Sequence, residues 1–376
     1  MSANPLSRRT LLASLGAAGT AAAVLPGSAA ARVEGHLRPA YLGSFSWTDP
    51  PGRGLDVAAH HLGTGELRPT HPVEGVPDAS WLAFSPNRHV LYATNELVPD
   101  GSVTALSLRD PRNPRILNTR SSRGGGPTHL SVHPSGRFLL TANYTDGTVV
   151  VHRLRPDGGL GESTDLVRHS SERREPHAHQ VLTDPSGRWV VAVDLGADAV
   201  FTYRLDPESG RLRENQRLSL AAGSGPRHLA FRPDGGHAYL VNELASTVTV
   251  LAWDAAKGTF EPGESVSTRP SGAEGENYPA EVVVTAAGDC YVTNRGDDEI
   301  AHFEVRDGGA RLRLVGTTGT GGAWPRHCAL DGSGRWLYVA NQNSGTVTRL
   351  PRDTVTGKPH PVIEAVAAPG VAMVAL

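Results

Sequence analysis

The sequence predicts an all-β fold, a seven-bladed β-propeller, on three observations. The chain repeats one unit six times at a period of about fifty residues, which is typical of propeller blades. Every copy has the pattern of two short strands around a turn, and the two ends of the chain carry the strands of one more blade. The six copies begin at Ser80, Thr128, His179, Arg227, Ala280 and Arg326.

Each copy predicts a strand, a tight turn and a second strand. Proline fixes one backbone angle and glycine allows a positive φ, so turns such as "HPSGR", "DPSGR" and "DGSGR" separate two runs of β-branched and aromatic residues. A third strand follows, as in "GTVVVHRL" and "STVTVLAW", and a fourth, more variable strand follows in segments such as "GRLRENQRLSL". Four antiparallel strands make one blade.

The seventh blade is predicted from the two ends of the chain. The C-terminal "VAMVAL" supplies its inner strand, and the N-terminal segments "AYLGSFS", "GLDVAAHHL" and "GELRPTHPV" supply the other three. Strands from both termini then share one sheet. Such closure removes the exposed sheet edge that would otherwise invite aggregation.

Residues 1–31 have the pattern of an export signal. Arg8 and Arg9 precede a run of Leu and Ala that ends in small residues, as in a twin-arginine signal peptide. A retained anchor is the alternative, but the apolar stretch is short for a membrane span and is interrupted by Gly and Pro. We therefore expect cleavage, no stable membrane anchor, export to the cell envelope or beyond, and one propeller domain over residues 32–376.

The bulk composition excludes some partners. The 376 residues carry a formal net charge of -2, without a basic stripe that would neutralise phosphates, so nucleic acid is not expected as a partner. Cys290 and Cys328 are too few for a disulfide scaffold and are expected to be small buried residues. A monomer is the default expectation.

A ring of unlike polar residues is predicted at one mouth of the central channel. The first strand of a blade lines the channel and the second runs back beside it, so the start of one and the end of the other meet at one face. The first positions are the six residues given above. Just beyond the second strands come Glu96, Tyr144, Leu195, Glu243, Arg295 and Gln342.

One sector of this ring combines a titratable base with several cations. Copies three to six contribute His179, Arg227, Glu243, Arg295 and Arg326. Such a group can bind an anion or stabilise an oxyanion, so we predict a functional site in this sector. A purely structural network of Arg and Glu ion pairs is the alternative.

Four further residues are predicted to bind substrate, namely His177, Arg326, Asp194 and Gln342. His177 precedes His179 by two residues, so the two imidazoles share a face if the strand extends that far. Both could alternatively ligate a metal, although no third ligand follows in a recognisable pattern.

Residues that recur between copies predict structural roles instead. Asparagine ends the second strand in five copies, at Asn95, Asn143, Asn242, Asn294 and Asn341. Histidine recurs at the second repeat position, at His129, His228 and His327. We expect these histidines to form hydrogen bonds between blades.

Several motifs together resemble the seven-bladed lactonase propellers, a family that includes a bacterial 6-phosphogluconolactonase and the fungal carboxy-cis,cis-muconate cyclase. They are "EPHAHQV", "GPRHLAF", "YLVNE", "YPAEVVV", "YVTNRGDD" and "PRHCALD". The resemblance spans nearly the whole chain after the signal. It implies that His179, Arg227, Glu243 and Arg295 match the family's proposed active-site set, and that no metal or organic cofactor is required.

The leading hypothesis is therefore a lactonase that opens a sugar-type or carboxylated lactone to the hydroxy acid by metal-independent general acid and base catalysis, with a small-molecule lactone as its partner. Either His179 or Glu243 would be the base, the other would be the acid that protonates the leaving alkoxide, and Arg227 and Arg295 would hold the anion and the oxyanion. The alternative is a non-catalytic extracellular propeller that binds an acidic glycan or a protein, since "YVTNRGDD" also resembles surface-layer propellers. A haem propeller is disfavoured because the chain has no CxxCH motif.

Overall fold

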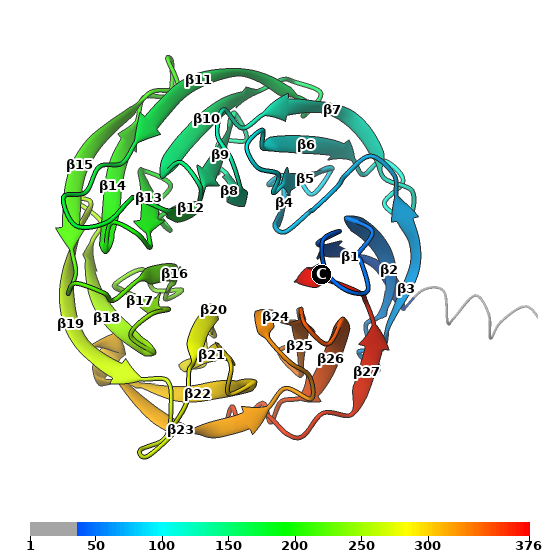
Figure 1. Cartoon of the computed structure of the whole chain (residues 1–376), viewed down its shortest axis with the longest axis vertical. Helices are drawn as coiled ribbons and strands as arrows, with labels where there is room; N and C mark the ends of the chain where they lie inside the picture. Colours follow the sequence, from blue (N-terminus) through cyan, green and yellow to red (C-terminus); the bar gives the residue numbers. More distant parts are fainter. Residues whose placement is uncertain (1–35) are drawn as a thin grey trace, which may run out of the picture. The chain divides into compact units, whose positions relative to one another are not determined.

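The computed structural model describes residues 36–376 and contains seven four-stranded antiparallel sheets. Contacts within the chain define a compact unit, Arg38–Leu376, in which the sheets form a ring of blades around a central axis, as Figure 1 shows. The predicted seven-bladed all-β propeller is thus confirmed. The signal peptide predicted for residues 1–31 lies outside the described residues.

We number the blades in chain order and give their strands from the axis outward. Blade 1 contains β4 (Leu82–Phe84), β5 (Val90–Asn95), β6 (Ser102–Ser107) and β7 (Arg115–Ser121). Blade 2 contains β8 (Pro127–Val132), β9 (Phe138–Asn143), β10 (Thr148–Leu154) and β11 (Leu160–Arg168). Blade 3 contains β12 (Ala178–Thr183), β13 (Trp189–Asp194), β14 (Ala199–Leu205) and β15 (Leu212–Ser219).

Blades 4 to 6 repeat this arrangement. Blade 4 contains β16 (Pro226–Phe231), β17 (His237–Asn242), β18 (Thr247–Asp254) and β19 (Thr259–Ser267). Blade 5 contains β20 (Tyr278–Val284), β21 (Asp289–Arg295), β22 (Glu299–Arg306), a 3-10 turn η1 (Asp307–Gly309) and β23 (Arg311–Gly319). Blade 6 contains β24 (Pro325–Leu330), β25 (Trp336–Asn341), β26 (Thr346–Pro351) and β27 (Glu364–Ala367).

Blade 7 joins the two ends of the described chain. Its inner strand is the C-terminal β28 (Val371–Ala375), which pairs with β1 (Leu37–Ser44), and β2 (Leu55–His61) and β3 (Leu67–Val73) complete the sheet. In Figure 1 the red C-terminal end accordingly lies beside the blue first strand near the axis. Both the composition of this blade and the order of its strands were predicted.

The hydrophobic core lies between the blades rather than in one centre. Each of seven apolar clusters draws on two neighbouring sheets, such as the cluster of blades 2 and 3 that includes Phe138, Val151 and Phe201. Cys290 and Cys328 are free and buried in two of these clusters, as predicted. Because every blade packs on both neighbours, the ring holds its inner strands at fixed positions around the axis.

The predicted turns form as expected between the first and second strands. In blade 2, Gly136 adopts a φ of 67° and its amide donates to the carbonyl oxygen of His133 at 2.8 Å. Gly187 does the same with Asp184 in blade 3. A residue with a side chain would be strained in the left-handed backbone conformation at these positions, whereas glycine adopts it without steric cost.

Candidate active site

A β-bulge in each of blades 2 to 6 aims the first repeat residue into the channel mouth. In blade 3, Ala178 pairs with Asp194 and Gln180 pairs with Val193, so His179 is the extra residue. The bulge therefore places Ala178, and not His179, opposite Asp194. A bulge bends the strand and redirects its side chain. The equivalent residues in the other bulges are Thr128, Arg227, Ala280 and Arg326.

The centre of the site is a carboxylate between two arginines. Glu243 Oε2 lies 2.6 Å from Arg295 Nη2 and 3.2 Å from Arg227 Nε. Backbone carbonyls orient both guanidinium groups, since Arg227 Nη1 donates to the Ala280 oxygen at 2.7 Å and Arg295 Nε donates to the Tyr278 oxygen at 2.9 Å. The three predicted residues are therefore brought together in one rigid group.

Burial shifts the pKa of the two guanidinium groups, Arg227 and Arg295. Arg227 is only 2% exposed, and burial together with repulsion from Arg295 and Arg326 lowers its pKa to about 9, although Glu243 opposes this. Burial also lowers the pKa of Arg295. Both groups remain cations at neutral pH, and in a dehydrated site they interact strongly with any negative charge that develops nearby.

Arg326 reaches the same mouth from blade 6. Its Nη2 atom lies 3.6 Å from Glu96 Oε2, and its guanidinium lies 5.1 Å from the centre of the Phe45 ring. Burial raises the pKa of Glu96, while Arg326 and a hydrogen bond from Ser80 lower it. Sequence reasoning placed Glu96 in the polar ring but gave it no role, because nothing in the chain order links blade 1 to blade 6.

His179 is buried beside these arginines with a free ring nitrogen. It is 5% exposed, and its Nδ1 atom has no hydrogen-bond partner among residues 36–376. Its ring contacts Tyr144 edge-on at 5.7 Å and His228 at 4.9 Å. Burial, and then the positive charge of Arg227, lower the pKa of His179 well below its usual value, so the imidazole is neutral at neutral pH.

The structure separates His177 and Asp194 from this cluster. Asp194 is fully buried, and its carboxylate bonds to His169 Nδ1 at 2.6 Å and to the backbone amides of His177 and Ala197, each at 2.7 Å. No carboxylate oxygen is left for a ligand, so this geometry indicates a structural role for Asp194 rather than the predicted substrate contact. His177 stacks on Tyr144 at 4.5 Å, and its Nδ1 donates to the Tyr144 carbonyl oxygen at 2.9 Å.

Gln342 is placed where a ligand contact remains open. Its side chain is 6% exposed, and its Oε1 atom has no hydrogen-bond partner among the described residues. The backbone amide donates to the Trp324 oxygen at 3.0 Å and so fixes the residue at the end of β25. A buried amide oxygen without a partner is costly, and a bound hydroxyl group or water would satisfy it.

Beneath the cluster, side chains of the second repeat position meet across the channel. The Trp81 ring lies 4.3 Å from His129, 5.1 Å from His228 and 5.4 Å from His327. These histidines also link blades, as predicted: His129 Nδ1 accepts from the Val181 amide of the next blade. His228 Nδ1 lies 3.2 Å from Glu281, and His327 Nδ1 accepts from the Val374 amide. They form a floor below the candidate site.

The recurring asparagines are structural, also as predicted. Each is at most 2% exposed. Asn143 Nδ2, for example, donates to the Ser122 carbonyl oxygen at 2.9 Å, and Asn294 Nδ2 donates to the Thr268 oxygen at 2.8 Å. These bonds tie the end of the second strand to the segment that enters the same blade.

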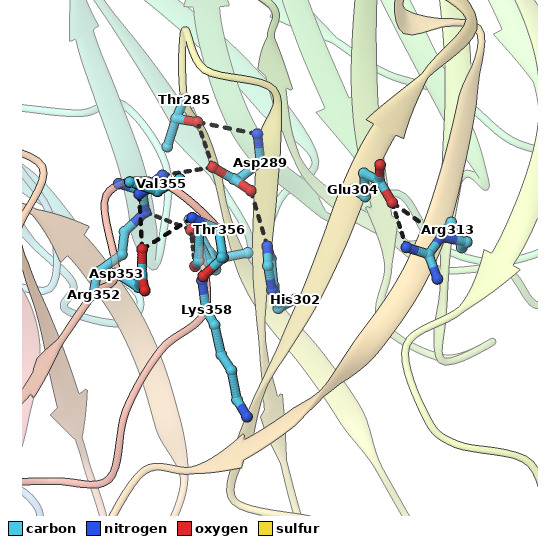
Figure 2. Close-up of polar contacts among 12 residues, drawn as sticks. Thr285, Asp289, His302, Glu304, Arg313, Arg352, Asp353, Val355, Thr356 and Lys358 are labelled. Atoms are coloured by element: carbon cyan, nitrogen blue, oxygen red, sulfur yellow. Dashed lines mark hydrogen bonds and ion pairs between the residues drawn. The ribbon is translucent and has the colours of Figure 1, made fainter.

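A second buried network of charged residues lies between blades 5 and 6, away from the channel mouth, and it is an example of a structural set of ion pairs in this protein. Figure 2 shows Asp289, at the beginning of β21, which accepts from His302 Nε2 at 3.0 Å and from Arg352 Nη2 at 2.5 Å. Arg352 Nε also donates to Tyr291 Oη at 2.6 Å. None of these side chains has a buried nitrogen or oxygen without a partner.

The channel cluster differs from that network. Among the described residues, it leaves three buried atoms with neither a hydrogen bond nor an ion pair: His179 Nδ1, His228 Nε2 and Gln342 Oε1. Unpaired buried atoms also occur elsewhere in the described residues, for example His152 Nδ1 and Thr183 Oγ1. A bound ligand or water is one explanation of such an atom. The occurrence of three of them beside the buried arginines of one mouth favours a binding site over the structural alternative.

Two further features of residues 36–376 concern metal ions and membranes. No three His, Cys, Asp or Glu side chains in this range are grouped so that they could hold a metal ion. No helix in the same range has the length and apolar character needed to cross a bilayer.

The family description "Lactonase, 7-bladed beta-propeller" matches residues 39–376. The chain belongs to this family. It is 34% identical over 286 residues to a 6-phosphogluconolactonase of Bacillus subtilis, an alignment that covers 74% of this chain and 81% of the relative. Lactonase chemistry is thus the activity that the chain's relatives support.

Two solved structures of lactonase propellers superpose closely. The periplasmic gluconolactonase of Pseudomonas aeruginosa has a TM-score of 0.83 at 28% identity, with 90% of this chain and 98% of that chain covered. A putative 6-phosphogluconolactonase of Bacteroides fragilis has a TM-score of 0.82 at 25% identity, with coverages of 90% and 97%. The lactonase propeller is thus conserved over nearly the whole described chain.

Proposed function

We propose that this protein hydrolyses a sugar-type or carboxylated lactone to the hydroxy acid, by general acid and base catalysis without a metal. The observation that carries the proposal is the Glu243 carboxylate between Arg227 and Arg295, next to the unpartnered nitrogen of His179. Lactone hydrolysis needs an activated water and a site for the negative acyl oxygen. This cluster offers both.

In the proposed mechanism the arginines hold the developing oxyanion. The guanidinium groups of Arg227 and Arg295 are already oriented by backbone carbonyls, so they need no rearrangement when charge appears on the acyl oxygen. Arg326 and Gln342 lie at the same mouth, where they can contact hydroxyl, carboxylate or phosphate groups of the substrate.

Either His179 or Glu243 takes the proton from water, and the structure favours His179. A neutral imidazole with a free nitrogen accepts a proton directly, whereas the Glu243 carboxylate already contacts two cations. The pKa of His179 is low partly because Arg227 repels the imidazolium. An oxyanion bound at Arg227 would offset that repulsion and strengthen the base as the transition state forms.

Export remains part of the proposal. The signal pattern of residues 1–31 supports it, and one structural neighbour is named a periplasmic gluconolactonase. An exported enzyme would encounter lactones outside the cytoplasm, so an unphosphorylated sugar lactone belongs among the first substrates tested, beside the 6-phosphate form that the relatives' names indicate.

The test is acid release at constant pH by residues 32–376 with a panel of lactones that includes gluconolactone and its 6-phosphate. We expect saturable hydrolysis that Arg227→Ala and Glu243→Ala each abolish, while Glu304→Gln, an exposed ion-pair residue far from the mouth, retains it. If folded wild-type protein releases acid from no lactone, the proposal is wrong and the non-catalytic binding propeller takes its place.

A further inference from the structure

Ring opening needs a proton at the ring oxygen. When the tetrahedral intermediate collapses, the ring oxygen leaves as an alkoxide unless a neighbouring group protonates it. In the proposed mechanism His179 begins as a neutral imidazole and gains a proton only from the attacking water. A hydroxyl group already placed at the mouth would deliver a proton to the ring oxygen while His179 holds the proton from water, and Glu243 contacts Arg227 and Arg295.

Tyr144 brings a phenol to this mouth. It follows β9 directly, at the position that Glu243 occupies after β17. Its backbone amide donates to the Gly126 oxygen at 2.8 Å, which fixes the start of the side chain. The hydroxyl group makes no hydrogen bond to any of residues 36–376, although the residue is half-buried.

The ring is held in place on two sides. The His177 imidazole stacks on it with 4.5 Å between centroids and 11° between planes, and His179 meets it nearly perpendicularly at 5.7 Å. His177 is held in turn through its amide by Asp194, which is bonded to His169. This chain of contacts explains why two imidazoles stand so close in the sequence: His177 positions Tyr144 and His179 faces the cluster.

The charges around the phenol suit a proton donor. Burial raises the pKa of Tyr144, and so does Glu243, so the hydroxyl keeps its proton until a stronger base appears. Arg227, Arg295 and Arg326 act on it in the opposite direction and would stabilise the tyrosinate. A departing alkoxide is much more basic than a phenolate, so the transfer is downhill once the carbon–oxygen bond begins to break.

We propose that the Tyr144 hydroxyl is a catalytic group that donates its proton to the leaving ring oxygen of the lactone. This step rests on the proposed lactonase function. Water attacks the carbonyl carbon and gives a proton to His179, the bond between the acyl carbon and the ring oxygen breaks, and that oxygen takes the Tyr144 proton. The imidazolium proton then restores the phenol, so one lactone and one water give one hydroxy acid.

The experiment compares leaving groups in wild type and Tyr144→Phe. Phenylalanine preserves the stack on His177, and an unchanged Tm would verify the fold. With δ-valerolactone or gluconolactone, which release aliphatic alkoxides, we expect kcat to fall about 100-fold. With dihydrocoumarin, which releases a phenolate of pKa about 10 that needs little help, we expect a loss below about fivefold.

Two further variants sharpen the result. Tyr92→Phe is the matched control, because the Tyr92 hydroxyl bonds to the Gly158 oxygen, outside the cluster, and we expect full activity. His177→Ala should lower kcat for the aliphatic lactones, and Tyr144→Phe in that background should add little, because both changes affect one proton transfer. A merely structural His177 would give losses that multiply.

Each possible result supports or overturns the proposed role of Tyr144. Equal losses on both kinds of lactone, or no loss in Tyr144→Phe, overturn the role of Tyr144 while leaving the lactonase proposal intact. The same is true if Glu96→Gln, rather than Tyr144→Phe, shows the dependence on leaving group, because burial raises the pKa of the Glu96 carboxyl group as well. A wild-type protein that opens none of these lactones refutes the proposed function, and this inference with it.

Discussion

Replacing Glu243 by glutamine tests the centre of the site, because it removes one charge and keeps the shape. Glu243 Oε2 contacts Arg227 at 3.2 Å and Arg295 at 2.6 Å. Breaking a buried ion pair typically costs about 3–5 kcal/mol, since it leaves an uncompensated charge. The Glu243 side chain is 17% exposed toward the channel mouth, so water compensates in part and we expect about 3 kcal/mol.

That loss can be measured as a shift in Tm. The entropy of unfolding is about 2 cal/mol/K per residue, so for the unit Arg38–Leu376 a loss of 3 kcal/mol lowers Tm by about 4 °C. The rate of lactone hydrolysis should fall about 100- to 1,000-fold, because the two arginines lose the carboxylate that, together with the backbone carbonyls, holds them in position for the oxyanion.

Glu304→Gln is the matched control for both measurements. Glu304 pairs with Arg313 on the exposed outer strands, as Figure 2 shows, and exposed ion pairs contribute little. Its Tm and kcat should stay at the wild-type values. A Glu243→Gln protein with wild-type Tm and wild-type kcat would refute the interpretation of this cluster, because neither burial nor catalysis would then depend on the carboxylate.

Three other substitutions and one change of pH give separate tests. His179→Ala should lower kcat at least about 100-fold with the fold intact by circular dichroism, and unchanged turnover would remove His179 from the mechanism. Asp194→Ala should lower the stability to denaturant by about 3 kcal/mol, because three donors, two of them fully buried, lose their acceptor. A raised KM at unchanged stability would instead restore the predicted substrate contact. Arg326→Ala should raise KM more than it lowers Tm, since its contact with Glu96 is long at 3.6 Å, and an unchanged KM would contradict a role in binding. Stability should also fall as the pH drops below about 6.5. Burial lowers the pKa of four histidines, His129, His179, His228 and His327, so the folded protein keeps them neutral while the unfolded chain protonates them below that pH. A Tm that stays constant between about pH 8 and pH 5 would contradict their burial.

The fold was predictable because its signals are local and repeated. A turn such as "HPSGR" fixes a hairpin without reference to the rest of the chain, and six copies make the assignment secure. The seventh blade followed from the same logic, since a ring of repeats needs its two ends in one sheet. The group of Arg227, Glu243 and Arg295 was predictable for a related reason: the repeat places equivalent positions side by side in adjacent blades.

The finer features of the site depend on contacts that no repeat encodes. The bulge at His179 shifts the register by one residue, and a register shift depends on packing across the blade rather than on the local sequence. Asp194 is bound by His169, which lies in the segment that precedes the blade, so its ring position alone suggested the wrong surroundings. Glu96 and Arg326 meet although they come from blades 1 and 6.

The two ends of β21 show how one strand supports both stability and chemistry. At its first residue, Asp289 is buried, yet hydrogen bonds from His302 and Arg352 outweigh the effect of burial and lower the pKa of the carboxyl group. Every buried polar atom of that network is paired, so it joins blades 5 and 6 without offering a site. At its last residue, Arg295 faces a channel mouth where other polar atoms lack partners. Each such atom costs about 1–3 kcal/mol of stability, which the packing between seven blades can sustain and which a bound substrate would recover. The free energy that the fold gives up at the mouth is therefore available for binding the substrate and, where the interaction strengthens with the oxyanion, for catalysis.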